Sequence, residues 1–276
     1  MSDNPAGSTP EAGERGVVPI RPPRGEESKK YTMRFAAVYT LLGLVFTAAV
    51  IGFVVLIVRP AAVSDPAWST WKPKTGNVTS MTKQISDHIA ASYRLSEAGG
   101  QLVALLSSKP QITSGTQPVP LNAIAIRRAP QSNAGIRIIE DTSKTRLYTL
   151  CGLGKNCSIE SGTASATRGR LVRREALETA LYTFKFVPAI DSIIAFMPPA
   201  PGGTTTSVLF LEKSALKDQL KQPLNKTLPL ATPPLPDAEN LAEAATIDRL
   251  TLKNTFSYEL TALQTGGAAI ILDPAS

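Results

Sequence analysis

The chain is poor in the residues that most often carry chemistry. Among its 276 residues there are one histidine and two cysteines. His88 is therefore the only imidazole available to a Ser-His-Asp arrangement, and one imidazole with two thiols does not supply the four ligands of a structural metal site. We interpret His88 as an isolated, exposed residue. Histidine-dependent catalysis and metal binding are both disfavoured.

The motifs of nucleotide-binding and hydrolytic enzymes are also missing. Gly152-Leu153-Gly154-Lys155 has the composition of a phosphate-binding loop, but that pattern needs glycine at position 149 and serine or threonine at 156. The chain has Thr149 and Asn156 there. It has no G-x-S-x-G, no H-E-x-x-H and no G-x-G-x-x-G before a helix. We therefore predict no catalytic, cofactor-binding or metal-ligating residue, and no cofactor.

Charge is absent from one long stretch, Phe35–Val58, FAAVYTLLGLVFTAAVIGFVVLIV. A helix rises about 1.5 Å per residue, so these positions span roughly 36 Å, enough to cross a hydrocarbon core of about 30 Å. The hydroxyls of Thr40 and Thr47 can bond to carbonyls of the helix itself. The stretch predicts a transmembrane helix with the lipid bilayer as its partner.

The basic residues around this helix predict its orientation. Lys29, Lys30 and Arg34 lie close before it, whereas only Arg59 follows directly. Positive residues favour the cytoplasmic side, which places the N-terminus inside and the C-terminal part outside the cell membrane, as in a single-pass signal anchor. A cleaved signal peptide is the alternative, because Ala62-Val63-Ser64 offers a peptidase small residues. The apolar core is far longer than the about 7–15 residues of a signal peptide, which favours the retained helix.

The helix divides the chain into four predicted parts. Residues 1–34 are rich in Pro, Gly, Glu and Arg and lack apolar periodicity, so they form a disordered cytoplasmic tail ahead of the span. Residues 59–77 form an extended juxtamembrane linker, and 78–276 the extracytoplasmic domain. Trp68 and Trp71 in the linker have two interpretations. They rest at the lipid–water interface or they cap the folded domain.

The two cysteines lie close together in the segment CGLGKNC. Cys151 and Cys157 flank a glycine-containing loop that the predicted orientation places on the oxidising side of the membrane. This predicts a local disulfide bond between them. The C-x5-C spacing differs from the C-x-x-C of thioredoxin-like redox sites, so redox catalysis is disfavoured.

The domain alternates between helical and extended patterns. A stripe of apolar residues three or four apart predicts a helix from Val78 that ends before Gly99. Ile190–Met197 is apolar on both faces, which indicates a buried central strand. The remaining segments are strands at 101–106, 121–127, 136–140, 146–150 and 207–211, a short helix capped by Ser214, a surface connection at 222–236, a helix at 237–249 and a hairpin of 255–263 with 268–272. We predict an α+β fold with a mostly antiparallel sheet.

The clearest helix pattern is Arg170–Phe186. Its apolar stripe runs along Leu177, Ala180, Leu181, Phe184 and Val187. The pattern places Arg173, Arg174 and Glu178 on the solvated side. Glu175 and Glu178 are near neighbours on this helix, but the exposed position of Glu178 argues against a general acid/base pair.

Positive charge is concentrated between Arg127 and Arg174. Ten basic and three acidic residues give this segment a net charge of +7, equal to that of the whole chain. A basic segment facing outward can bind anionic lipid headgroups or acidic envelope polymers, and its orientation disfavours nucleic acid. Solvated basic faces without a partner are the plain alternative. The candidate residues for an anionic partner are Arg168, Arg170, Arg173 and Arg174.

The segment RRxALETALYTFKFVPxIDSIIAFMPP, Arg173–Pro199, carries a resemblance. It is similar to single-pass envelope proteins of actinobacteria. Its helix, proline and apolar strand also resemble, over fewer than thirty residues, the spore-germination type of envelope domain. The resemblance implies an envelope location and brings no activity or functional residue with it.

Three functional hypotheses follow from the sequence. The first is a membrane-anchored extracytoplasmic binding or scaffolding protein of the cell envelope, working alone or with other membrane proteins in a larger assembly. The second is an envelope hydrolase or transferase whose site is assembled from residues distant in sequence. The third is a membrane-bound regulator that signals through its tail.

Overall fold

A computed structural model describes residues 27–58, 67–114, 117–130, 134–159, 164–199, 207–236, 238, 241–264 and 266–275 of the chain. The chain divides into two compact units, Met1–Ser64 and Asp65–Ser276. Most of the predicted disordered tail, residues 1–26, lies outside the described residues. Residues 27–34, which the sequence assigned to that tail, are helical.

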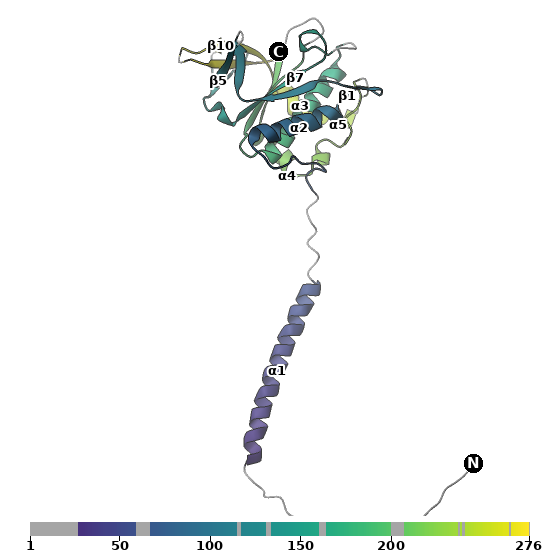
Figure 1. The fold of residues 1–276 in the computed structure, drawn as a ribbon, viewed down its shortest axis with the longest axis vertical. Coiled ribbons are helices and arrows are strands. Elements are labelled where there is room, and N and C mark those ends of the chain that lie inside the picture. The colour runs from purple at the N-terminus through teal and green to yellow at the C-terminus, as the bar shows by residue number, and fades with distance from the viewer. Residues whose placement is uncertain are drawn as a thin grey trace, which may run out of the picture. The chain divides into compact units, whose positions relative to one another are not determined.

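The first unit contains helix α1, Glu27–Val58 (Figure 1). Within it, Arg34–Ile51 is long and apolar enough to span a membrane, and none of that window is buried. The Thr40 and Thr47 hydroxyls donate to the carbonyls of Ala36 and Gly43, both at 2.7 Å, as the sequence predicted. The helix starts earlier than the predicted boundary at Phe35 because Glu27–Arg34 contains neither proline nor glycine to stop it.

The second unit is built on a sheet that has nine strands among the described residues. Along the sheet the order is β3-β7-β8-β9-β10-β11-β5-β4, and β6 pairs with β5. A separate small sheet pairs β1 with β2. The strand bounds are β1 Arg94–Ser96, β2 Gly99–Gln101, β3 Ala104–Ser108, β4 Gln111–Ser114, β5 Gln117–Ile126, β6 Arg137–Ile139, β7 Thr145–Cys151, β8 Ser192–Phe196, β9 Ser207–Glu212, β10 Thr255–Ala262 and β11 Ala268–Pro274.

Most neighbouring strands are antiparallel, which confirms the predicted fold class. Two pairs are parallel, β7 with β8 and β11 with β5, so the sheet is mixed. The terminal hairpin of β10 and β11 forms as predicted. It does not sit at an edge of the sheet, because β11 also pairs with β5 and β10 with β9.

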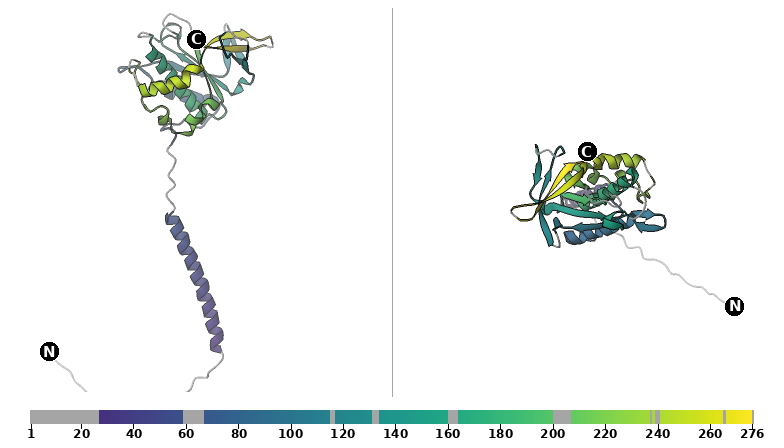
Figure 2. Two further views of the ribbon diagram at one scale, coloured as in Figure 1. Left: turned by 180° about the vertical axis from the view of Figure 1, so that it is seen from behind. Right: turned by 90° about the horizontal axis from the view of Figure 1, so that it is seen from above.

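The longer helices of this unit are α2 (Val78–Ser92), α3 (Ala166–Phe186) and α5 (Leu241–Thr251). A short helix, α4, covers Lys217–Lys221. Helix α3 contacts both α2 and α5, and Figure 2 shows the helices gathered against the sheet. Short 3-10 turns lie at Thr142–Lys144, Lys155–Cys157, Lys213–Leu216, Leu224–Lys226 and Leu252–Asn254.

The central strands bury both faces. In β8, Ile193 and Ala195 join the core formed with the helices, whereas Ile194 joins a second core on the opposite face. This confirms Ile190–Met197 as the site of a buried central strand, observed over Ser192–Phe196. The second core draws on β5, β9 and β11, which is possible because the sheet curls around it.

The two tryptophans cap the domain. Trp68 packs edge-on against Tyr182 and Phe186 at 5.3 and 5.6 Å between ring centroids, and Trp71 stacks on His88 at 3.9 Å. Residues 67–77 of the predicted linker 59–77 therefore belong to the compact unit that begins at Asp65. His88 is half-buried against this stack rather than an isolated exposed residue.

Other elements begin or end at residues that differ from the prediction. The predicted strand 101–106 is observed as the end of β2 and the start of β3, because Leu102 and Val103 turn into the core between them. Ser214 lies inside a 3-10 turn, and neither this turn nor α4 has a side-chain cap. The connection 222–236 is only partly at the surface, since Thr227 and Leu228 are buried.

Candidate functional site

Helix α3 begins where a serine satisfies its first turn. The Ser165 hydroxyl accepts a hydrogen bond from the backbone N–H of Arg168 at 3.1 Å, which makes Ser165 the N-cap. The predicted start at Arg170 was therefore one turn late. The four candidate arginines all lie in the first nine residues of α3. A helix turns about 100° per residue, so they point in different directions.

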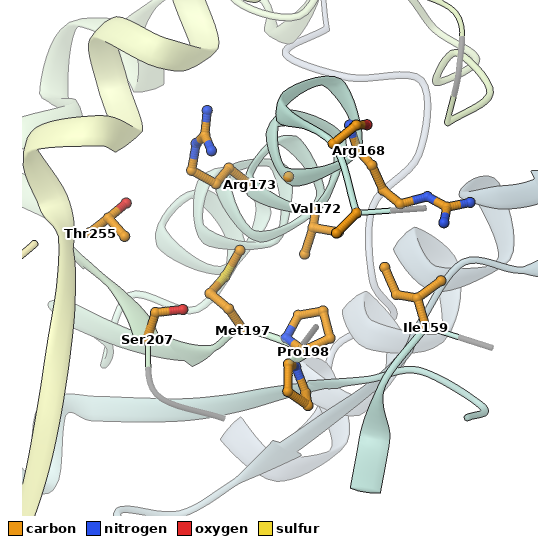
Figure 3. A pocket seen from close by; sticks show the side chains of 12 residues that line it. Ile159, Arg168, Val172, Arg173, Met197, Pro198, Ser207 and Thr255 are labelled. Carbon is orange, nitrogen blue, oxygen red and sulfur yellow. The ribbon is translucent and has the colours of Figure 1, made fainter. Parts of the chain in front are cut away.

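A pocket of about 240 Å³ lies beside the first turns of α3 (Figure 3). We call it the α3 pocket. Five segments far apart in the sequence form it, including the ends of β8, β9 and β10 that meet α3. Its lining residues are Ile159, Ala164, Ser165, Arg168, Gly169, Val172, Arg173, Met197, Pro198, Pro199, Ser207 and Thr255.

The α3 pocket combines apolar walls with positive charge. Figure 3 shows Val172, Met197 and Pro198 around its centre, with the side chains of Arg168 and Arg173 diverging from α3. Arg168 is only 8% exposed. Among the residues that the structure describes, no aspartate or glutamate lines the pocket.

Arg173 and Arg170 share one carboxylate. Nη2 of Arg173 lies 2.6 Å from Asp248 Oδ1, and Nη2 of Arg170 lies 2.9 Å from Asp248 Oδ2. Arg173 also donates to the Thr251 hydroxyl at 3.1 Å. Burial works to raise the pKa of Asp248, but the hydrogen bonds from the two guanidinium groups lower it overall. Asp248 therefore binds both arginines at once.

Arg174 lies in a separate, buried cluster. Its Nη1 donates to the Tyr93 hydroxyl at 2.6 Å and to Glu178 Oε2 at 2.9 Å. Its Nη2 donates to the Leu230 carbonyl at 2.7 Å and to Glu243 Oε1 at 3.0 Å. Because Arg174 is 1% exposed, it does not reach an external partner. The expectation that Arg174 and Glu178 face solvent is wrong, since α5 and the chain near residue 230 cover that side of α3.

Beside this cluster, Glu175 is fully buried. Neither carboxylate oxygen has a hydrogen-bond partner among the described residues. Burial, and then the charge of Glu178, raise the pKa of Glu175 well above its ordinary value. Burial also raises the pKa of Glu178. Neither residue lines the α3 pocket, so they supply it with no acid or base.

The candidate arginines therefore divide between two places. Arg168 and Arg173 line the α3 pocket. Arg170 and Arg174 line a void of about 20 Å³ on the α5 side of α3, together with Glu243. The four residues do not form one continuous basic surface, and binding of an anionic partner stays a prediction for the first two.

The predicted disulfide between Cys151 and Cys157 is present. Inside its loop, the Gly152 N–H donates to the Cys157 carbonyl at 2.8 Å, and the Gly154 N–H donates to the Ser158 carbonyl at 2.8 Å. The chain leaves the loop directly into Ile159, which forms one wall of the α3 pocket. Among the described residues, no group of three or more His, Cys, Asp or Glu residues could hold a metal ion.

Sequence reasoning found two arginines of the pocket but not the pocket itself. Its walls come from segments separated by up to about a hundred residues, and no local pattern links them. One local signal was available. Gly169 sits inside a long helix, where glycine is unfavourable, and it lines the pocket.

Comparison with protein families, curated proteins and solved structures finds no match for this chain. The function is therefore inferred from the sequence and from the geometry of the described residues.

Proposed function

We propose that this chain is a single-pass membrane protein of the cell envelope whose domain, Asp65–Ser276, lies outside the cytoplasm and serves as a binding module. The single observation that carries the proposal is the exposure of α1. The side chains of Phe46, Leu44 and Leu41 are 71, 68 and 67% exposed. Leaving such a side chain in water rather than an apolar phase costs about 1.5–3 kcal/mol. A bilayer would remove this cost along the apolar part of the helix.

Charge and redox chemistry support the orientation. Lys29, Lys30 and Arg34 precede the apolar stretch closely, and this bias favours a cytoplasmic N-terminus. The bond between Cys151 and Cys157 agrees with a domain in an oxidising compartment. Two independent features thus favour the same side for the domain.

The α3 pocket supports binding rather than catalysis. Its lining includes the hydroxyl residues Ser165, Ser207 and Thr255, and the described part of the lining has no histidine, cysteine or carboxylate that could act as a base or nucleophile beside them. The described walls are mainly apolar, which suits the binding of a small ligand. The hydrolase or transferase hypothesis gains no support from this arrangement.

A fractionation and topology experiment tests the proposal. We expect the full chain, expressed in its host, to stay in membranes washed with alkaline carbonate. Alkaline phosphatase fused after Ser276 should be active, because that enzyme folds only outside the cytoplasm. A variant with Leu44→Arg and Phe46→Arg should lose most insertion, since each central arginine costs about 2.5–3.5 kcal/mol. The matched control, Leu44→Ala with Phe46→Ala, should insert normally.

A freely soluble chain with two alkylatable cysteines would refute the proposal. The proposal would also be refuted if the alkaline phosphatase fusion at Ser276 were inactive while a fusion to a cytoplasmic fluorescent reporter at the same position were fluorescent. The domain would then lie inside the cell.

A further inference from the structure

We propose that a group of exposed lysines, gathered where the chain from α1 enters the domain, docks the domain on anionic phospholipid headgroups of the membrane that holds α1. We call this group the entry patch. Its members are Lys72, Lys74, Lys185, Lys217, Lys221 and Lys226, all of them exposed. The inference names the partner of the binding module and to that extent rests on the proposed function.

Packing around Trp68 brings the patch together. The Leu224 N–H donates to the Trp68 carbonyl at 2.7 Å. The Trp68 ring packs edge-on against Phe186, the last residue of α3, with 5.6 Å between the ring centroids. Lys185 Nζ lies 5.6 Å from the centre of the Trp68 ring and donates to the Leu220 carbonyl of α4 at 3.0 Å. Segments far apart in the sequence thus meet around this tryptophan.

The entry patch is strongly positive. Three described segments form it: 67–76, 185–190 and 213–228. Together they contain the six patch lysines, the half-buried Lys213 and one acidic residue, Asp218. Asp218 lies 3.7 Å from Lys221, and because both side chains are more than 70% exposed the pair is weak. In the neighbouring sequence 59–66, the charges of Arg59 and Asp65 cancel.

Acidic residues next to these segments already have cationic partners outside the patch. The pairs are Glu212 with Arg137, Asp191 with Lys144 and Asp87 with Lys83, at 2.8, 3.7 and 2.7 Å. These carboxylates therefore do not neutralise the patch lysines. The sequence gave the chain outside 127–174 no net charge, so only the tertiary structure reveals this positive surface.

The covalent chain keeps the entry patch close to the bilayer that holds α1. Eight residues, 59–66, separate Val58 at the end of α1 from Ala67. At about 3.3–3.6 Å per residue, this connection spans at most about 32 Å. A short tether gives an effective concentration in the millimolar range, so a weak attraction for each lysine suffices for docking. The bilayer surface is the partner that this tether supplies.

The side chains of the patch suit a layer of headgroups. Each lysine near an anionic bilayer surface strengthens binding about fivefold. None of the exposed large apolar side chains of the described residues lies in the three segments. The contact therefore involves headgroups rather than acyl chains, and it should weaken as salt screens the charges.

Lysine acetylation of the full chain in nanodiscs, read by mass spectrometry, tests the inference. Phosphatidylcholine discs are compared with discs that also contain phosphatidylglycerol, at 0.01 and 1 M salt, where the Debye length is about 30 and 3 Å. We expect the patch lysines to react at least about fivefold more slowly in the anionic discs at low salt. This protection should disappear at high salt.

Two lysines serve as internal controls in the same sample. Lys155 and Lys253 are exposed and lie shortly before Ile159 and Thr255, which line the α3 pocket beside the first turns of α3. Lys185 lies in the last turn of the same helix. A docked domain should therefore leave the reaction rates of the two controls unchanged.

A charge-neutral variant locates the contact. Lys217→Gln, Lys221→Gln and Lys226→Gln together remove three charges from exposed positions of the patch. We expect Lys72 and Lys185 in this variant to react in anionic discs as fast as they do in zwitterionic discs.

The matched control variant combines Lys155→Gln, Arg249→Gln and Lys253→Gln. It removes the same charge from exposed positions outside the patch, and it should keep the protection. Near-UV circular dichroism checks that both variants fold. If the patch variant does not fold, the acetylation pattern of the wild type decides alone.

Three results would overturn the inference. The first is an equal reaction rate of the patch lysines in both kinds of disc. The second is equal slowing of the patch lysines and the two controls, which would show proximity without docking. The third is stronger protection by soluble polyglutamate in zwitterionic discs than by anionic discs, which would assign the patch to an acidic polymer.

The two proposals fail separately. A chain that enters the discs but whose patch lysines are not protected refutes only the docking. A chain that stays out of zwitterionic discs, but whose patch lysines are protected by anionic discs, refutes only the membrane assignment. A chain that associates with neither kind of disc refutes both.

Discussion

At the residue scale, two glycines of this domain have opposite roles. A Cβ at Gly152 would collide with the carbonyl of Ser158 in the disulfide loop, whereas one at Gly169 meets only ordinary contacts. Substitution by alanine therefore tests which of the two glycines the fold requires.

We predict that Gly152→Ala destabilises the domain, because backbone in the loop must shift to admit the methyl group. Gly169→Ala should instead stabilise it by about 0.5–1 kcal/mol, since alanine favours helix. Thermal unfolding of the full chain in detergent micelles measures both. Equal effects of the two substitutions would contradict the assignment of Gly169 as dispensable for packing.

Glu175 is a fully buried carboxyl residue whose two oxygens have no hydrogen-bond partner among the described residues. We predict that Glu175→Met stabilises the domain at pH 7 by about 1–3 kcal/mol, because it replaces an unpaired buried carboxyl group with an apolar chain of similar length. Denaturant unfolding of both proteins measures the difference. Glu97→Met, at an exposed position, is the control and should change little.

This difference should depend on pH with a definite sign. The folded-state pKa of Glu175 is raised, so its contribution to stability is fully present below the ordinary glutamate value and is lost as the pH rises through the folded pKa. The wild type should therefore lose stability relative to Glu175→Met as the pH rises from about 4.5 to the raised folded-state pKa. A difference that stays constant over this range would show that Glu175 is not protonated in the folded state.

At the scale of elements, α3 is the helix on which the domain depends. It contacts α2 and α5 and packs on the sheet, and residues on every side of it are buried. Arg174 links it to Glu178 on its own next turn, to Tyr93 after α2 and to Glu243 in α5. One guanidinium group thus joins α3 to the C-terminal end of α2 and to the first turn of α5.

We predict that Arg174→Met destabilises the domain by about 3–5 kcal/mol, because it removes the guanidinium group that pairs with Glu178 and Glu243 inside the fold. The matched control on the same helix is Arg170→Met. Its pair with Asp248 is partly exposed, and Arg173 remains to bind that carboxylate. The control should therefore cost about 1 kcal/mol or less. Equal losses in the two variants would refute the special role of Arg174.

At the scale of the whole molecule, the chain consists of an apolar helix and a folded domain, and one disulfide closes a short loop within that domain. We predict that reduction leaves a monomer with two free thiols and removes about 2 kcal/mol of stability, the value expected for so short a loop. Mass spectrometry after alkylation and non-reducing gels measure both. A dimer that dissociates on reduction would contradict the bond within one chain.

The sequence by itself determined the features that depend on neighbouring residues. An uncharged stretch, two nearby cysteines and the periods of helix and strand are local patterns, and they predicted α1, the disulfide, β8 and the terminal hairpin. The capping residues at helix ends were predicted less well. Ser165 and Ser214 have the same side chain, but only Ser165 caps a helix, because the backbone conformation around each serine decides whether its hydroxyl reaches a free N–H.

Tertiary structure alone decided what lies opposite each residue. The pattern around Arg174 and Glu178 indicated an exposed helix face, and α5 covers it from about seventy positions away. The parallel pairing of β11 with β5 and the walls of the α3 pocket likewise join distant segments. Burying a polar group costs free energy unless it is hydrogen-bonded, and many of its partners come from distant parts of the chain. The neighbouring residues in the sequence therefore do not predict its environment.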